Sequence, residues 1–140
     1  MNQGELFTTI LIDLQRIFRT EIVPKGLSYS QVLAIIIIPD DGVEMSELAW
    51  ALGLENSTVT RLIARLEKKD YVTREQSAID KRSINVFLNE KGTLLQNDIE
   101  QKIEKIGDEI FLKNGKVEKE IFLENLSLFQ WSLKKTFLKR

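Results

Sequence analysis

The chain has 140 residues, 43% of them hydrophobic, which is enough for one hydrophobic core and too short to expect two independent domains. It has no cysteine and no histidine, which excludes disulfides, thiol redox sensing, histidine acid–base catalysis and the usual zinc sites, and no cofactor is expected. No run approaches the ~20 apolar residues that span a bilayer, and no basic segment precedes an apolar one at the N-terminus. We therefore expect a cytoplasmic protein that contacts no membrane.

Two helices are expected in the first part of the chain. Apolar residues recur at steps of three and four from Glu5 to Ile22, which predicts an amphipathic helix that ends before Pro24. Ser28 and Gln31 have the spacing of a capping box, so a second helix is predicted over residues 28–38.

A turn and a short helix follow. Residues 40–42 read Asp-Asp-Gly, which is typical of a solvated turn and does not indicate a catalytic carboxylate pair. A short helix is predicted after this turn, and Gly53 marks its end. Its core-facing residues are expected to be Leu48, Ala49 and Leu52. An exposed Trp50 would line a ligand pocket or a dimer groove, whereas a half-buried one would pack against its own core, which is the commoner outcome.

The next helix, predicted over residues 57–69, has two distinct faces. One is an apolar stripe at positions i, i+3, i+4 and i+7, formed by Val59, Leu62, Ile63 and Leu66. The other carries hydroxyls near the helix start and cations further along, which suits contacts to base edges and phosphates. The residues of this face predicted to contact DNA are Ser57, Thr58, Thr60, Arg61, Arg65 and Lys68. The alternative is an ordinary solvated helix face.

A β-hairpin is expected after this helix. Residues 71–74 and 83–88 are rich in β-formers, and the second run alternates around Ile84, Val86 and Leu88. The tip between them carries cations that could enter a minor groove, where Arg favours narrow and strongly negative segments. The hairpin residues predicted to contact DNA are Arg74, Lys81 and Arg82, with Asp80 predicted to pair with and orient an arginine, most simply Arg82.

Two long helices are predicted beyond Gly92. Leu95, Ile99, Ile103, Ile106 and Ile110 form one apolar stripe, which Asn114 and Gly115 end; the second stripe contains Phe122, Leu126, Phe129, Leu133 and Phe137. Together with residues 7–18, these stripes offer more apolar surface than the central region can cover. A homodimer is therefore predicted, against the alternative of a purely intramolecular bundle.

The charge of the chain favours DNA binding only weakly. Its net charge is −1, whereas nucleic-acid modules are often plainly basic. Residues 55–82 contain seven cations and five anions, so the small positive excess lies where the DNA contacts are predicted. We expect modest non-specific affinity for duplex DNA.

These motifs together resemble a known family. The run Asp80-x-Arg82, five residues, then Leu88-Asn89-x-x-Gly92 is similar to the signature D-x-R-x5-L-T-x-x-G of MarR-family transcription regulators, and residues 57–69 resemble that family's recognition helix. The resemblance implies a mainly α fold with a small β-hairpin wing: a winged helix-turn-helix region at residues 28–92, flanked by dimerisation helices at 1–24 and 93–140 within one domain.

The resemblance also implies a function. It implies a dimeric repressor that binds double-stranded DNA at a pseudo-palindromic operator, with recognition helices one duplex turn, ~34 Å, apart. It further implies release by a small aromatic or phenolic effector lodged between the DNA-binding region and the dimerisation helices. The family's cysteine-based peroxide sensing is excluded, because the chain has no cysteine.

Three positions depart from the family pattern. Glu55 replaces a frequent capping serine, so Asn56 is expected as the alternative cap of the recognition helix. Asp70 replaces a frequent glycine and is expected to adopt the left-handed conformation. Asn89 replaces a threonine and is expected to cap the following helix.

Two other classes of function compete. An enzyme is disfavoured, because the chain has no histidine, cysteine or phosphate-cradling glycine loop. A winged-helix adaptor that binds another protein through the same helix face is the second alternative, favoured by the slightly acidic overall charge.

Overall fold

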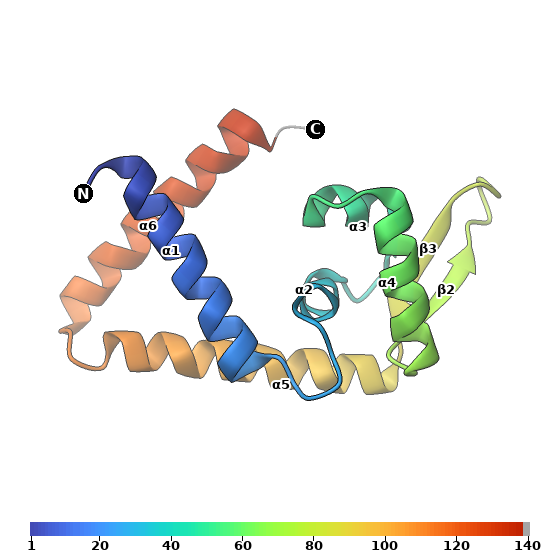
Figure 1. Ribbon diagram of the computed structural model, residues 1–140, viewed down its shortest axis with the longest axis horizontal. Helices are drawn as coiled ribbons and strands as arrows, with labels where there is room; N and C mark the ends of the chain where they lie inside the picture. The colour runs from blue at the N-terminus through green and yellow to red at the C-terminus, as the bar shows by residue number, and fades with distance from the viewer. Residues whose placement is uncertain (139–140) are drawn as a thin grey trace. The chain divides into compact units, whose positions relative to one another are not determined.

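The computed structural model describes residues 1–138, which are mainly helical with one small antiparallel sheet, as the sequence predicts (Figure 1). The elements in chain order are α1 (Gln3–Ile17), the π-helical turn η1 (Phe18–Ile22), α2 (Tyr29–Ile37), β1 (Val43–Glu44), α3 (Met45–Leu52), α4 (Asn56–Lys68), β2 (Val72–Gln76), β3 (Ile84–Leu88), α5 (Glu90–Phe111) and α6 (Lys116–Phe137).

The chain divides into two compact units after Ile103, inside α5. The first unit holds α1 to β3 and the first part of α5, and the second holds the rest of α5 and α6. The organisation as one domain, with residues 28–92 as its DNA-binding region, stays a prediction. Residues 139–140 of the predicted dimerisation segment lie outside the described residues.

The core of the first unit lies where α2, α3 and α4 meet the sheet. The apolar stripe of α4 is buried as predicted, with Val59, Ile63 and Leu66 fully covered. Residues that complete this core from other elements are Ile22, Val32, Ile35, Ile38, Leu48, Ala49, Val72, Val86 and Ile99. Because this stripe fixes the rotation of α4, its hydroxyl- and cation-bearing face must point outward.

A buried amide holds α5 against α2. The Gln96 Nε2 donates hydrogen bonds to the backbone carbonyls of Ile35 and Ile38, at 2.8 and 2.9 Å. The carbonyls at the end of a helix lack partners within that helix, so this side chain satisfies them where water is excluded. Sequence periodicity did not indicate this role for Gln96.

Helix ends agree with the sequence in most places. The capping box of Ser28 and Gln31 opens α2 as predicted, while Asn2 forms a second capping box that starts α1 two residues before the predicted Glu5. The expected cap by Asn56 is wrong, because Asn56 already lies in the first turn of α4 and the capping position falls to Glu55, which makes no side-chain capping bond.

The sheet has three strands in the order β1-β3-β2, both pairings being antiparallel. The β2–β3 hairpin was predicted; β1 was not, because two residues are too short to show an alternating pattern. Val86 is the fully buried residue of β3. Ile84, in the same alternating run, is 38% exposed near the outer end of the hairpin.

The base of the hairpin meets α5 at a tight joint. Asp70 adopts the left-handed conformation as predicted, with φ of 66°, and directs the chain from α4 into β2. Asn89 caps α5 as predicted, since its Oδ1 accepts from the Gly92 backbone N–H at 2.8 Å. Gly92 packs so closely on the backbone that a Cβ there would lie 2.0 Å from the Tyr71 carbonyl oxygen.

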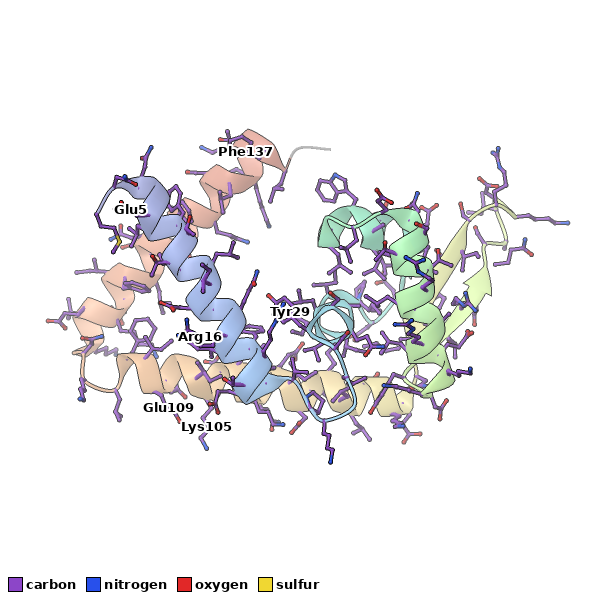
Figure 2. The ribbon with its side chains drawn as sticks, in the orientation of Figure 1. Glu5, Arg16, Tyr29, Lys105, Glu109 and Phe137 are labelled. Carbon is purple, nitrogen blue, oxygen red and sulfur yellow. The ribbon has the colours of Figure 1, made fainter. Side chains whose placement is uncertain are left out.

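The helices at both ends of the chain expose apolar side chains. On α1 these include Phe7, Ile10, Leu11 and Leu14. On α6 the predicted stripe of Phe122, Leu126, Phe129, Leu133 and Phe137 is exposed, with Phe137 labelled near the end of the helix in Figure 2. Within the second unit, Phe111 and Phe122 pack edge to face with ring centroids 5.2 Å apart. Over residues 1–138, no helix is long and apolar enough to cross a membrane.

Candidate nucleic-acid interface

The outward face of α4 carries the predicted hydroxyls and cations. Ser57, Thr60, Arg61, Arg65 and Lys68 are exposed and Thr58 is half-buried. The Thr60 hydroxyl donates to the Asn56 carbonyl at 2.8 Å, so its hydrogen is used within the helix and its oxygen keeps lone pairs for an incoming donor. The face can therefore offer hydroxyl oxygens and guanidinium groups along one helix.

Three adjoining hollows join this face to the hairpin. The first, of about 370 Å³, is lined by Thr58, Arg61 and Arg65 of α4 together with Ser28 and Ser30 at the start of α2. The second, of about 390 Å³, shares Arg65 with the first and also includes Glu67. The third, of about 460 Å³, shares Glu67 and extends across the hairpin to Lys81 and Arg82.

Because neighbouring hollows share lining residues, Arg61 and Arg82 belong to one continuous surface of the first unit. Figure 1 shows the same relationship in the ribbon, where the hairpin lies directly beside α4. Long side chains project from its tip in Figure 2. A helix face and a hairpin tip on one side of a scaffold is the arrangement that can contact a duplex at two places at once.

The tip of the hairpin is shaped by short-range hydrogen bonds. The Ser77 Oγ accepts from the backbone N–H groups of Ile79 and Asp80, at 3.2 and 3.3 Å. The Asp80 Oδ1 accepts from the backbone N–H and the Nε of Arg82, at 3.0 and 3.3 Å. The structure thus places Asp80 against Arg82, whose side chain remains 92% exposed. The contact of Arg82 with DNA stays a prediction.

Arg74 occupies a different environment from the other predicted contacts. Its Nη2 lies 2.9 Å from the Oε1 of Glu67 on α4, and both side chains are about one-third exposed. Hydrogen bonds from the Arg74 side chain hold the pKa of Glu67 below its ordinary value of 4.5, against the opposing effect of desolvation. The charge of Arg74 is therefore largely engaged by a carboxylate of the protein itself.

Glu67, which lines two of the three hollows, was not predicted from the sequence. Its seven-residue separation from Arg74 spans a helix end, a left-handed turn and a strand start, so helical or strand spacing gives no signal for the pair. Ser28 and Ser30 were also missed as neighbours of the α4 face, since only the packing of α2 against α4 brings them there. Trp50 is exposed on α3, at 44%, so the commoner expectation of a half-buried aromatic is wrong, and its role at a ligand pocket or dimer groove stays a prediction.

The segment that carries α2 to β2 has a counterpart among known protein families. Residues 27–84, which run from the start of α2 to the start of β3, match the model of the MarR family. Over this segment the chain is similar to the MarR family. Among residues 1–138, no group of carboxylates suited to holding a metal ion is found.

Proteins similar to this chain include named regulators and solved structures. The HTH-type transcriptional regulator SarZ of Staphylococcus epidermidis is 34% identical over 82 residues, which is 56% of this chain and 55% of SarZ. The chain thus spans about half the length of this curated relative. A MarR transcriptional regulator from Methanosarcina mazei Go1 has a TM-score of 0.80 at 25% identity, covering 95% of this chain and 97% of that one.

One similar structure is a complex. Streptococcus pneumoniae FabT, solved with DNA, has a TM-score of 0.74 at 23% identity and covers 97% of this chain and 94% of its own. At that identity the likeness establishes the shared fold.

Proposed function

We propose that this chain is a sequence-specific DNA-binding transcription regulator that acts as a dimeric repressor at a pseudo-palindromic operator. The observation that carries the proposal is the continuous surface from Arg61 on α4 to Arg82 at the hairpin tip. In this arrangement α4 enters the major groove, where its hydroxyls and arginines meet base edges and phosphates, and Arg82 approaches the adjacent minor groove.

The residues proposed to contact DNA are those predicted from the sequence: Ser57, Thr58, Thr60, Arg61, Arg65, Lys68, Arg74, Lys81 and Arg82, with Asp80 supporting the hairpin tip. The structure gives Arg74 a second role, because its guanidinium binds Glu67. The local positive excess is small, so affinity for unrelated DNA should be modest and most discrimination should come from direct contacts to bases.

The homodimer is proposed from the exposed apolar residues of α1 and α6. Each of these helices presents several large apolar side chains to solvent. An apolar surface of this extent is unusual on a monomer and is most simply covered by a second copy under two-fold symmetry. Two-fold symmetry would place two α4 helices about one duplex turn apart, which requires a near-palindromic site.

The proposal includes control by a small aromatic effector. An effector that binds preferentially to one spacing of the two α4 helices would shift the dimer away from the groove repeat and release the operator. The protein is proposed to act through binding and not through catalysis, and its cytoplasmic location rests on the same proposal, since it must reach genomic DNA.

Selection of bound fragments from random duplex DNA tests the function. We expect a consensus of two inverted half-sites one duplex turn apart, bound with an affinity that falls steeply with salt because each neutralised phosphate releases counterions. Failure to bind any duplex at low salt would reject the proposal. It would favour the alternative of a winged-helix adaptor that binds another protein through α4, which the net charge of −1 also accommodates.

A further inference from the structure

Two polar contacts join the hairpin to the body of the first unit, one on each arm. The first connects β2 to α4 through Arg74 and Glu67. The Arg74 guanidinium donates to the Glu67 Oε1 from Nη2 at 2.9 Å and from Nε at 3.3 Å, and the Arg74 backbone N–H donates to the Oε2 at 3.2 Å. Both carboxylate oxygens are thus engaged by one residue of the hairpin.

The second contact connects the other arm to the start of α3. The Ser83 Oγ donates to the Glu44 Oε1 at 2.8 Å. Glu44 lies in β1, opposite Asn85 of β3, and directly precedes α3. Ser83 is the neighbour of Arg82 in the chain, so this bond anchors the arm one residue from the exposed guanidinium. We call the pairs Glu67–Arg74 and Glu44–Ser83 the hairpin braces.

The braces are needed because a two-stranded hairpin alone does not fix the orientation of its tip relative to the rest of the unit. An isolated hairpin is marginally stable, and its outer half, from Gln76 to Ile84, has no neighbouring strand beyond its partner. The outer half must nevertheless keep Arg82 at a fixed distance from α4 for both to meet a duplex together. Each brace binds a hairpin residue to a carboxylate on the helix-turn-helix body.

We propose that Glu44, Glu67, Arg74 and Ser83 are positioning residues that set the reach of Arg82 relative to α4. This inference rests on the proposed DNA binding and deepens it. It revises the direct DNA contact proposed above for Arg74: the guanidinium supports the hairpin tip and does not bind a phosphate, because it is already bound to Glu67. The affinity gained from the contact of Arg82 with DNA then depends on the braces, although the brace residues do not contact the duplex themselves.

A double-mutant cycle separates positioning from direct contact. If Arg74 contacts DNA itself, the losses from Arg74→Ala and Arg82→Ala should combine, since independent contacts add. If Arg74 acts by positioning Arg82, removing Arg82 leaves Arg74 with nothing to position. Arg74→Ala should then have little effect in the Arg82→Ala protein.

The experiment uses the full chain and the duplex obtained by selection, with dissociation constants measured at one fixed ionic strength. We expect Arg74→Ala and Arg82→Ala each to weaken binding about tenfold, and the double variant to be weakened about tenfold as well and not about a hundredfold. Arg74→Lys should recover part of the loss, because an ammonium can still pair with Glu67. Glu75→Gln, which changes an exposed carboxylate on the same strand, is the matched control and should bind as the wild type does.

Ser83→Ala tests the second brace without changing any charge. We expect a severalfold weaker affinity that disappears in the Arg82→Ala background, with Thr73→Ser, an exposed hydroxyl on β2, as the control. Because the chain has no cysteine, a spin label at Ile79→Cys reports on the tip directly; this position is 99% exposed. Its mobility should increase in Arg74→Ala and in Ser83→Ala.

The outcomes distinguish this inference from the proposed function. A wild-type protein that binds no duplex overturns the proposed function and the inference with it. A protein that binds its duplex but shows an additive double variant, about a hundredfold weaker, overturns the inference alone and returns Arg74 to the direct contacts. An unchanged affinity of both Arg74→Ala and Ser83→Ala also overturns it.

Discussion

The carboxylate of Asp80 binds Arg82 twice, through the backbone N–H at 3.0 Å and through the guanidinium Nε at 3.3 Å. The first bond fixes the turn of the chain and the second biases the direction of the side chain. Because Nε is used, the two terminal nitrogens of the guanidinium remain available to an acceptor outside the protein. The Arg82 guanidinium is therefore available to bind an acceptor outside the protein, although its Nε is paired with Asp80.

Arg82→Ala is expected to weaken binding of the selected duplex about tenfold, ~1.4 kcal/mol, because it removes a charge-assisted contact at the hairpin tip. Thermal unfolding should change by less than about 0.5 kcal/mol, since the side chain is almost fully exposed. Affinity is measured by fluorescence anisotropy at two salt concentrations. Lys113→Ala, an exposed cation between α5 and α6, is the control; an equal loss there would show that only total charge matters.

Asp80→Asn gives opposite expectations from net charge and from geometry. Removing an acid from the tip should strengthen DNA binding if charge alone decides, because the surface becomes more positive. We expect instead a loss of about threefold, since the charge-assisted bond that orients Arg82 is weakened. The measurement is the ratio of dissociation constants for Asp80→Asn and wild type at one ionic strength. A tighter variant would contradict the orienting role of Asp80.

The outward side of α4 could be predicted from the sequence because one local rule determines it. Once Val59, Leu62, Ile63 and Leu66 are assigned to the core, the helical repeat places every other side chain. The same holds for the capping box of Ser28 and Gln31, which depends on residues three positions apart. Local spacing carries the information in both cases.

The hairpin braces could not be predicted, because their partners meet only after the chain has turned. Glu44 and Ser83 are 39 positions apart, and Glu67 reaches Arg74 across a change from helix to strand. β1 was not predicted for a related reason, since its two residues form a strand only by pairing with β3. Asn56 was wrongly predicted as a cap, because residue propensities do not fix the start of a helix to within one residue.

Phe129→Glu is expected to weaken the proposed dimer strongly. Phe129 lies in the exposed apolar stripe of α6, and a carboxylate buried in a subunit interface loses its hydration without gaining a partner. Sedimentation at micromolar concentration should show a larger monomer fraction than in wild type, and operator affinity should fall with it. Ser127→Glu introduces the same charge outside the stripe and should remain dimeric. A dimer of unchanged stability in Phe129→Glu would exclude this stripe from the interface.

The Glu67–Arg74 pair should make a small, pH-dependent contribution to stability. The pKa of Glu67 is lowered in the folded protein, chiefly by the Arg74 side-chain hydrogen bond, so its contribution is complete above the ordinary value of 4.5. It is lost as the pH falls below 4.5 through the lowered value. Since both side chains are partly solvated, we expect a contribution of only about 0.5 kcal/mol.

Urea unfolding of wild type and Glu67→Gln at pH 6 and at pH 3 measures this contribution. The difference in unfolding free energy between the two proteins should be present at pH 6 and smaller at pH 3, because protonation of the carboxylate increases as the pH falls toward its lowered pKa. Equal differences at both pH values would mean that the loss in Glu67→Gln does not come from the ionised pair.

Gly92→Ala tests the joint between the hairpin and α5. A Cβ at this position would lie 2.0 Å from the Tyr71 carbonyl oxygen, and that oxygen belongs to the backbone, so neither side can yield without moving the strand base or the helix. The same oxygen accepts from the Asn89 backbone N–H at 3.1 Å, so a shift would also disturb the start of α5. We expect a loss of about 1–3 kcal/mol in unfolding free energy.

Gly107→Ala is the matched control, because Gly107 lies in the same helix and a Cβ there meets no atom within 4 Å. Alanine restricts the unfolded chain and favours the helix, so this variant should gain about 0.5–1 kcal/mol. Both are measured by urea unfolding with the midpoint and slope fitted together. If Gly92→Ala proved as stable as wild type, the close approach at Tyr71 would not constrain the joint, and the hairpin base could tilt without cost.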